Sequence, residues 1–320
     1  MIALSSRDPD QSGKPVRYAY LGPEGTFTQA ALLAFDPDAA ESSLPCVTIQ
    51  ATLEAVRTGA AEQGIVPIEN SVEGAVTATL DELATGDDLV IWAEVPLPVA
   101  FALLVRPGTQ LSGIATVGGH PQAQAQCRRW LTEHLPDAAW RPASSNAEAA
   151  RQVADGALDG ALAGAFAAGR YGLEVLVDGA HDRPDAVTRF VVVTQPGPLP
   201  AATGSDRTSL VAFLAADHPG ALMEILTEFA VRGINLMRIE SRPTGHGLGR
   251  YYFFIDCEGH LDDARVGEAL MGLRRVCAEV RFLGSYPRHD RGQTHVRPGT
   301  SDAEFAEAAA WLNRLRYGRV

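Results

Sequence analysis

Short apolar segments alternate with helix-forming segments over residues 16–195 of this 320-residue chain. The apolar segments have the length of strands, and those between them have the periodicity of amphipathic helices. The predicted strands are 16–22, 46–49, 63–68, 89–95, 99–105, 114–118, 138–141, 160–163 and 187–194. The predicted helices are 27–35, 51–59, 72–85, 121–135, 146–155 and 165–172. This alternation predicts an α/β fold with mainly parallel sheets.

The apolar passage at residues 89–105 divides that region in two. It contains Pro96 and Pro98, and proline is excluded from the interior of a central strand. We therefore interpret the passage as a crossover between two sheets. One lobe then comprises residues 16–105 with 181–195, and the other comprises residues 106–180. We expect a cleft between two lobes that are joined by two strands. In open α/β sheets, ligands bind beyond the carboxyl ends of the strands, so this cleft is the predicted binding site.

A second domain follows a proline-rich segment. Residues 196–200 hold three prolines and a glycine, which indicate a stiff linker that we extend to residue 206. Residues 207–286 have the α+β ferredoxin-like order βαββαβ, with Gly245-His246-Gly247-Leu248-Gly249 as a hairpin turn. Residues 287–320 form a tail in which a capping box at Ser301 and Glu304 begins a helix. Residues 1–15 are polar, and we expect a flexible extension.

Composition and charge exclude several classes of function. The formal net charge of −12 argues against nucleic-acid binding, and the best apolar stretch, 89–105, contains a glutamate and two prolines, so no membrane span is expected. Lys14 is the only lysine, which excludes a phosphate-loop NTPase and Schiff-base chemistry. The four cysteines form no Cys-x-x-Cys pair and the eight histidines are scattered, so we expect reduced thiols and no metal. Without a signal-peptide pattern, we expect a cytoplasmic protein.

Two polar residues interrupt an otherwise apolar strand at residues 186–193. Thr188 and Arg189 lie in the middle of it. A strand that is apolar on both faces is normally buried, and a buried hydroxyl or guanidinium needs hydrogen-bond partners. A bound anion would provide them, and so would an ion pair or a bond to the backbone. The strand alone leaves both interpretations open.

Polar turns follow three other predicted strands, at residues 22–28, 69–74 and 120–126. The first opens an Ala- and Leu-rich helix with Thr26 or Thr28 as its N-cap, and Ser71 is the natural cap of the helix after the second. Free N–H groups at such helix starts suit a carboxylate or a phosphate. Because each turn follows a strand and opens a helix, we expect all three to face one cleft.

These segments together resemble the prephenate dehydratase family. The resemblance rests on Gly22-Pro23-Glu24-Gly25-Thr26-Phe27, Pro67-Ile68-Glu69-Asn70-Ser71 with Gly74, His120-Pro121-Gln122-Ala123 with Gln126-Cys127, and Thr188-Arg189-Phe190. Gly220-Ala221-Leu222 and Glu240-Ser241-Arg242-Pro243 complete it in an ACT-type module. The family usually has Asn two residues before the motif Thr, where this chain has Ala186, and Asp185 is the nearest polar substitute. The resemblance implies a two-lobed catalytic domain like type II periplasmic binding proteins.

The resemblance also implies a reaction. Prephenate loses carbon dioxide and its hydroxyl to give phenylpyruvate in phenylalanine biosynthesis; aromatisation drives this, so no cofactor or metal is expected. Thr188 is expected to donate a hydrogen bond to the departing hydroxyl, backed by Glu69 or water. Glu69 is otherwise a carboxylate bonded to backbone. Arg189, on the opposite strand face from Thr188, either contacts substrate or anchors the lobes. The expected substrate-binding residues are Thr26, Asn70, Ser71, Gly74, Gln122, Arg189 and Phe190.

An ACT-type module implies an allosteric site for phenylalanine that spans two subunits, so we expect a homodimer or homotetramer. Its expected residues are Asp217, Gly220, Ala221, Leu222, Asn235, Leu236, Met237, Glu240 and Ser241. Two other functions remain open. Arogenate dehydratase performs the same chemistry on a substrate with an amine in place of the keto group, and a two-lobed protein can be a non-catalytic regulator that binds a small molecule.

Overall fold

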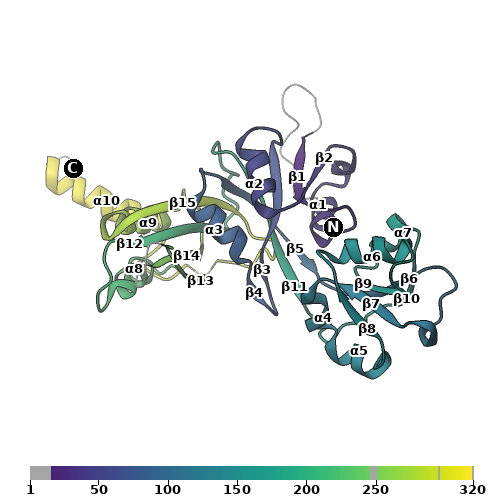
Figure 1. The fold of residues 1–320 in the computed structure, drawn as a ribbon. Coiled ribbons are helices and arrows are strands. Elements are labelled where there is room, and N and C mark those ends of the chain that lie inside the picture. The colour runs from purple at the N-terminus through teal and green to yellow at the C-terminus, as the bar shows by residue number, and fades with distance from the viewer. Residues whose placement is uncertain (1–15, 246–250, 295, 319–320) are drawn as a thin grey trace. The chain divides into compact units, whose positions relative to one another are not determined.

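The computed structural model describes residues 16–245, 251–294 and 296–318 (Figure 1). The chain forms two compact units. The first comprises the residues up to Glu82 with Val95–Val193, and the second comprises Leu83–Glu94 with the residues from Thr194 onward. The expected extension at 1–15 and the centre of the expected turn after Gly245 lie outside the described residues. No helix in the described part of the chain is both long and apolar enough to cross a membrane.

The first lobe of the first unit is built on a sheet with the order β2-β1-β3-β11-β5, to which β4 adds a short pairing with β3. Strand β1 runs parallel to both β2 and β3, and helices α1 and α2 pack against β1 and β3. The strands are β1 Tyr18–Leu21, β2 Ser43–Cys46, β3 Gln63–Asn70, β4 Gly74–Ala75, β5 Val90–Pro98 and β11 Val187–Thr194. The helices are α1 Phe27–Phe35, the 3₁₀ turn Pro37–Glu41, α2 Ile49–Arg57 and α3 Thr77–Thr85.

The second lobe of the first unit has a mixed sheet with the order β10-β6-β9-β7-β8. Strand β7 is parallel to β8 and β9, whereas β6 is antiparallel to β9 and β10. The strands are β6 Ala102–Val105, β7 Thr116–Gly119, β8 Ala139–Pro142, β9 Gly160–Ala163 and β10 Glu174–Val177. The helices are the 3₁₀ turn Leu111–Gly113, α4 Pro121–Gln126, α5 Arg128–His134, α6 Asn146–Ala154 and α7 Ala167–Tyr171.

Two segments connect the lobes, and they hydrogen-bond to each other. The N–H of Val99 donates to the carbonyl of Ala186 at 2.8 Å, and the N–H of Ala180 donates to the carbonyl of Phe101 at 2.7 Å. Val99, Phe101 and Ala186 are all buried in the apolar core of the second lobe. The two crossings therefore act as one connection between the sheets, as the crossover at residues 89–105 predicted.

Several element boundaries differ from the sequence prediction. The predicted helix 72–85 begins only at Thr77, because Asn70 Oδ1 accepts from the N–H groups of Val72 and Glu73 and folds this stretch into a turn before β4. The predicted helix 121–135 is two helices. Asp182, which is distant in sequence, accepts hydrogen bonds from the N–H groups of Arg129 and Trp130. These bonds satisfy the first turn of a separate helix, α5. Strand β10 was not predicted.

The second unit contains a four-stranded antiparallel sheet with the order β13-β14-β12-β15. Its elements, which follow the predicted βαββαβ order, are β12 Asp206–Leu214, α8 Ala221–Ala230, β13 Leu236–Pro243, β14 Tyr251–Glu258, α9 Ala264–Val276 and β15 Cys277–Pro287. Helices α8 and α9 cover one face through Ile225, Phe229 and Leu273. The final helix, α10 Asp302–Tyr317, begins at the predicted capping box of Ser301 and Glu304.

The segment Leu83–Glu94 packs within this second unit although it lies far earlier in the sequence. Gly284 has φ +136°, and a Cβ there would overlap the carbonyl oxygen of Ile91. Glu94 is only 5% exposed; the N–H of His289 donates to it at 2.9 Å, and Arg207 lies 3.4 Å from its carboxylate. The buried charge of Glu94 is thus matched by residues from the other end of the chain.

Asp159 joins the starts of β7 and β9, two inner strands of the second lobe's sheet, and gives a testable pH dependence. Its carboxylate accepts from the Thr116 hydroxyl at 2.8 Å and from the N–H groups of Thr116 and Ala115 at 2.9 and 3.1 Å. The Thr116 hydroxyl, with these N–H groups, lowers the pKa of the carboxyl. The stabilisation is therefore complete above the ordinary Asp pKa and is lost as pH falls through the lower folded-state value.

We expect Asp159→Asn to lower the free energy of unfolding by about 1 kcal/mol at pH 7, since the carboxylate is partly screened by solvent. The difference from the unsubstituted protein should shrink as pH falls below about 4. Urea denaturation at several pH values measures this, with the exposed carboxylate of Asp137 as the control in Asp137→Asn. A difference that stays constant down to pH 3 would contradict the assignment.

Candidate active site

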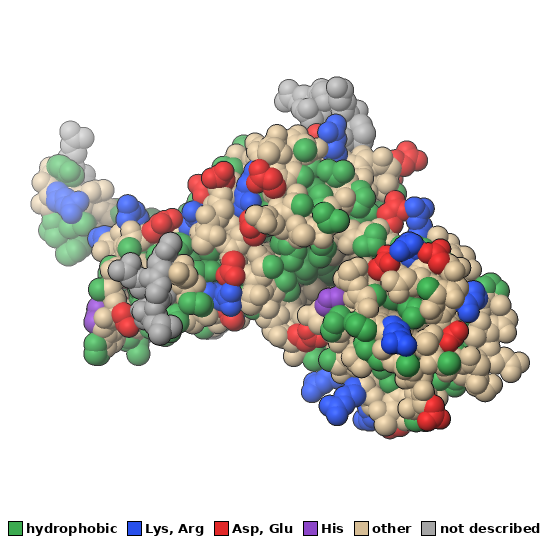
Figure 2. Space-filling view, viewed as in Figure 1, with side chains coloured by type: hydrophobic (Ala, Val, Ile, Leu, Met, Phe, Trp, Pro, Cys, Tyr) green, Lys and Arg blue, Asp and Glu red, His purple; other side chains and the backbone are tan. Residues whose placement is uncertain are grey.

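A cavity of about 710 Å³ lies between the two lobes of the first unit. Figure 2 shows hydrophobic side chains gathered in a hollow at this position. Its apolar wall includes Phe27, Phe101 and Phe190, and Phe27 packs edge-on against Phe101 with ring centroids 5.5 Å apart. Its polar lining comes from both lobes and consists of Thr26, Thr28, Asn70, Glu73, His120, Gln122, Gln126, Ser144, Ser145, Asn146 and Thr188, with the Cys46 thiol.

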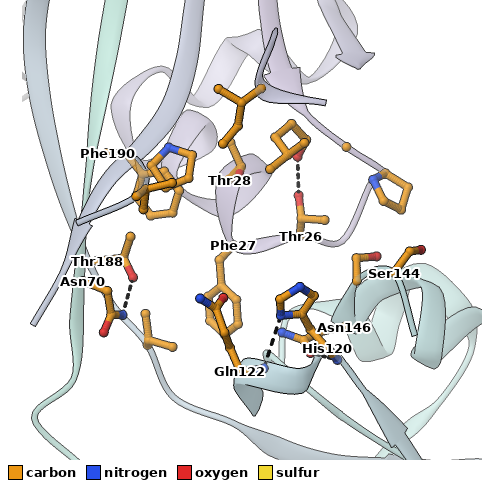
Figure 3. A pocket seen from close by; sticks show the side chains of 18 of the residues that line it. Thr26, Phe27, Thr28, Asn70, His120, Gln122, Ser144, Asn146, Thr188 and Phe190 are labelled. Carbon is orange, nitrogen blue, oxygen red and sulfur yellow. Dashed lines mark hydrogen bonds between the residues drawn. The ribbon is translucent and has the colours of Figure 1, made fainter. Parts of the chain in front are cut away.

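Thr188 faces the cavity and is only 8% exposed. Its Oγ1 accepts a hydrogen bond of 2.8 Å from Asn70 Nδ2 on the neighbouring strand β3 (Figure 3). The orientation of the Asn70 amide follows from its other end, because Oδ1 accepts from the N–H groups of Val72 at 2.8 Å and Glu73 at 3.1 Å. Nδ2 must therefore face Thr188. With its oxygen already accepting, the Thr188 hydroxyl keeps its own proton available for a group in the cavity.

Arg189 and Glu69 pair with each other and do not line the cavity. Arg189 Nη2 and Nε lie 3.0 and 3.2 Å from Glu69 Oε2. Arg189 is 9% exposed, so this ion pair provides its guanidinium with a carboxylate in the buried strand. The expectation that Arg189 and Thr188 point to opposite faces is met by their placement.

Ser71 and Gly74 also lie outside the cavity lining. The expected role of Ser71 as a helix cap is wrong, since its Oγ accepts from the N–H of Val187 at 3.0 Å and no helix starts there. Gly74 is exposed with φ +82° at the start of β4, a conformation that a side chain would strain. The other expected residues, Thr26, Asn70, Gln122, Thr188 and Phe190, all line the cavity.

The turn at residues 22–28 brings the start of α1 to the cavity. Thr26 is the N-cap, as predicted; its hydroxyl accepts from the N–H of Gln29 at 3.3 Å and donates to the Leu21 carbonyl at 3.1 Å. Gly25 has φ +83°, and a Cβ there would lie 3.0 Å from the ring of Tyr171. Glycine is required at this position by both conformation and space.

Two helix starts of the second lobe face the same cavity. At α4, His120 Nδ1 accepts from the N–H of Gln122 at 3.3 Å. At α6, Ser145 is the N-cap, and Asn146 Oδ1 accepts from the N–H of His120 at 2.8 Å, which ties the two starts together. Figure 3 shows His120, Asn146 and Ser144 across the cavity from Thr188 and Asn70. Helix starts on both lobes thus direct N–H groups at one space.

The cavity contains little formal charge. Among the described residues that line it, none is a lysine or arginine, and the one carboxylate is that of Glu73. Burial raises the pKa of the Cys46 thiol, which keeps it protonated at neutral pH and makes it a poor nucleophile. Neutral hydrogen-bond donors are therefore the groups available to an anionic ligand.

Several lining residues were not among the expected site residues, and some carried a signal in the sequence. Ser145 follows a predicted strand and precedes a predicted helix, and serine at such a position is a preferred N-cap. Glu73 carried no such signal, because its place in the cavity depends on the turn that Asn70 forms. Ala186, where the family usually has Asn, is 1% exposed in the apolar core and does not line the cavity.

The residues expected to bind an effector fall into two groups within the second unit. Asp217 and Gly220–Leu222 lie after the end of β12, at the start of α8, where Gly220 has φ +96°. Asn235–Met237 lie at the start of β13, where Leu236 pairs with Cys257 at the other end of the sheet. Glu240 and Ser241 lie further along β13. At about 1.5 Å per residue, the ten residues of α8 separate its two ends by about 15 Å.

Comparison with known proteins identifies relatives of both units. The family model for prephenate dehydratase matches residues 18–198, and the model for the ACT domain matches residues 209–275. The chain is 51% identical over 312 residues to a prephenate dehydratase of Mycobacterium marinum, covering 95% of this chain and 96% of that one.

Solved structures share the fold. A prephenate dehydratase of Arthrobacter aurescens in complex with L-Phe is 51% identical, with a TM-score of 0.88 over 94% of this chain and 99% of that one. A structure described as a novel type of quorum quenching acylase is 30% identical, with a TM-score of 0.75 over 86% of this chain and 99% of that one.

Proposed function

Since this chain belongs to the prephenate dehydratase family, we propose that its cavity binds prephenate and that Thr188 assists the departure of the ring hydroxyl. The enzyme is a lyase that performs a decarboxylating dehydration. The observation that carries the role of Thr188 is the hydrogen bond from Asn70, because it leaves the Thr188 proton free to donate. A donor aimed at developing negative charge lowers the barrier of such a step.

The two carboxylates of prephenate need partners, and the cavity offers neutral ones. The starts of α1 and α6, nine-residue helices on opposite lobes, direct N–H groups into it, and the Thr26 hydroxyl and the Gln122 amide add polar groups. Helix N-termini stabilise anions without a formal cation. The ring itself would lie against the aromatic wall that includes Phe27 and Phe190. This arrangement fixes the substrate with the hydroxyl toward Thr188.

Glu69 and Arg189 have a positioning role in this proposal. Their ion pair joins β3 to β11, the strands that carry Asn70 and Thr188, and so holds those two side chains in register. The alternative, in which Glu69 relays a proton to the leaving group, is tested by Glu69→Gln. Ser71 acts in the same sense through its bond to the backbone N–H of Val187, and Gly74 permits the turn into β4.

The domain organisation follows the same lines. We assign residues 16–195 to catalysis, 196–206 to the linker, 207–286 to the ACT domain and 287–320 to the tail. The Pro200 carbonyl accepts from His260 at 3.1 Å, which attaches the linker to the second unit. A cytoplasmic location is part of the proposal.

L-phenylalanine is the effector in this proposal, in line with the Arthrobacter relative that binds it. Gly220–Leu222 and Asn235–Met237 lie at opposite ends of α8, too far apart for one amino acid to touch both within one module, whereas Glu240 and Ser241 lie on β13 level with the last part of β12. A site that uses both groups therefore needs the module of a second subunit, which supports a homodimer or homotetramer. Preference for prephenate over arogenate is tested by assaying both compounds.

Substitutions at Thr188 and Asn70 test the proposed donor. Thr188→Ala should lower kcat for phenylpyruvate formation by about 10²- to 10³-fold, whereas Thr188→Ser should retain much of it. Asn70→Asp keeps an acceptor for the N–H groups of Val72 and Glu73 but presents a carboxylate to Thr188. The Thr188 hydroxyl would then donate its hydrogen bond to that carboxylate and not to the substrate. Asn70→Asp should cost as much as Thr188→Ala, and the double variant should lose no more than either. Near-normal kcat in Asn70→Asp would contradict the proposal that Thr188 donates a hydrogen bond to the departing hydroxyl.

A point substitution tests regulation better than truncation at the linker, since truncation would strip Leu83–Glu94 of its packing partners. Leu222→Glu places a carboxylate at the start of α8, 38% exposed, where the effector carboxylate is proposed to bind. We expect the phenylalanine concentration for half-maximal response to rise at least about 10-fold. Met271→Glu, on the exposed face of α9, is the control. An unchanged response in Leu222→Glu would place the effector elsewhere.

A further inference from the structure

The proposed reaction needs a proton in every turnover. The prephenate dianion and one proton give the phenylpyruvate anion, carbon dioxide and water. A threonine hydroxyl can hold a hydrogen bond to the leaving oxygen, but it is too weak an acid to release a proton to it. Another group in the cavity must therefore supply that proton.

The described residues that line the cavity offer three candidates, Glu73, His120 and Cys46. His120 caps α4 by accepting the Gln122 N–H at Nδ1, so a proton on that nitrogen would break the cap. Burial raises the pKa of the Cys46 thiol and makes it a weaker acid. Glu73 is the remaining group.

The backbone of Glu73 is linked to Thr188 through the side chain of Asn70. Its N–H donates to Asn70 Oδ1 at 3.1 Å, and the same Asn70 amide donates to Thr188 at 2.8 Å. Its carboxylate belongs to the first lobe but is oriented by the second, since Gln126 Nε2 donates to Glu73 Oε1 at 2.8 Å. Gln126 is 8% exposed and thus fixed by packing. Because Oε1 accepts, a proton on this carboxyl belongs on Oε2.

The charges around Glu73 matter when the substrate binds. Two substrate carboxylates would enter a cavity whose described lining has no lysine or arginine, so a proton on its one lining carboxyl would offset part of the added negative charge. On the adjoining strands Arg189 is paired with Glu69, and beside Gln126 the carboxylate of Asp182 accepts the N–H groups at the start of α5. His120 Nδ1 is engaged as the acceptor that caps α4.

We propose that Glu73 takes up a proton as prephenate binds and delivers it from Oε2 to the departing hydroxyl. The bond to the ring carboxylate breaks and releases carbon dioxide, and its electron pair enters the ring. The carbon–oxygen bond breaks with its pair on oxygen, which takes the proton and leaves as water. Glu73 ends as a carboxylate and regains its proton from solvent, to which it is exposed. This inference rests on the proposed function.

Glu73→Gln is the primary test, because it keeps an acceptor for Gln126 and removes only the acid. We expect kcat for phenylpyruvate formation to fall about 10²-fold. The decline of kcat with rising pH, which reports an acid that must be protonated in the complex, should disappear in Glu73→Gln and persist in Glu73→Asp. Glu133→Gln removes an exposed carboxylate on α5 and should behave as the unsubstituted enzyme.

Proton uptake on binding gives a readout that a structural role would not move. Prephenate mixed with the slow variant Thr188→Ala in weak buffer with an indicator dye should draw a proton from solution. Thr188→Ala/Glu73→Gln should not, with circular dichroism showing that both are folded. Equal proton uptake by Thr188→Ala and by the double variant would overturn the inference. So would a decline of kcat with rising pH that disappears in Glu69→Gln and persists in Glu73→Gln. Neither result would contradict the proposed function. An unsubstituted enzyme that forms no phenylpyruvate would overturn the proposed function and this inference together.

Discussion

The hydrogen bonds between the two lobe-connecting segments are the constraint on which the site depends. Val99 bonds to Ala186 and Ala180 to Phe101, so the outgoing and returning chains form one paired connection. Its residues are buried in the second lobe's core, and the strand that follows Ala186 carries Thr188. Because the same backbone that joins the lobes leads into β11, the distance between Thr188 and the helix starts on the far side of the cavity is set by main-chain geometry.

The cavity shows how a strongly acidic chain can receive an anion. Its net charge is −12, and the described lining has no lysine or arginine. Helix starts supply partial positive charge in fixed directions, and such dipoles act most strongly where water is excluded. Arginine is present nearby, but Arg189 is held by Glu69 in the buried strand. Orientation by neutral donors suits a reaction that releases carbon dioxide, since a cation placed against the reacting carboxylate would stabilise the charge that must be lost.

Sequence reasoning located the elements whose signals are local. Helix α1 begins at Thr26, one of its two predicted caps, β9 has the predicted bounds, and the capping box at Ser301 starts α10. It failed where a distant residue decides. Asp182 begins a separate helix, α5, inside one predicted helix, and the Asn70 side chain folds the first residues of another predicted helix into a turn, so that α3 begins only at Thr77. Four of the expected substrate-binding residues and the expected catalytic Thr188 line the cavity, whereas Glu73 could not be found, because its position follows from that turn and from Gln126 on the other lobe.

Because Leu83–Glu94 belongs to the second unit, the coding sequence of that unit is split, and part of the coding sequence of the first unit lies between its two pieces. The partners of Leu83–Glu94 are encoded much later, and Glu94 bonds to a residue 195 positions downstream. During synthesis the ribosome releases this segment long before β12 and β15 exist, so it must wait while the rest of the first unit is completed. A recombination event at the proline-rich linker would not transfer a whole regulatory unit, because part of that unit lies upstream within the catalytic reading frame. Catalytic and regulatory parts of this chain are therefore inherited together.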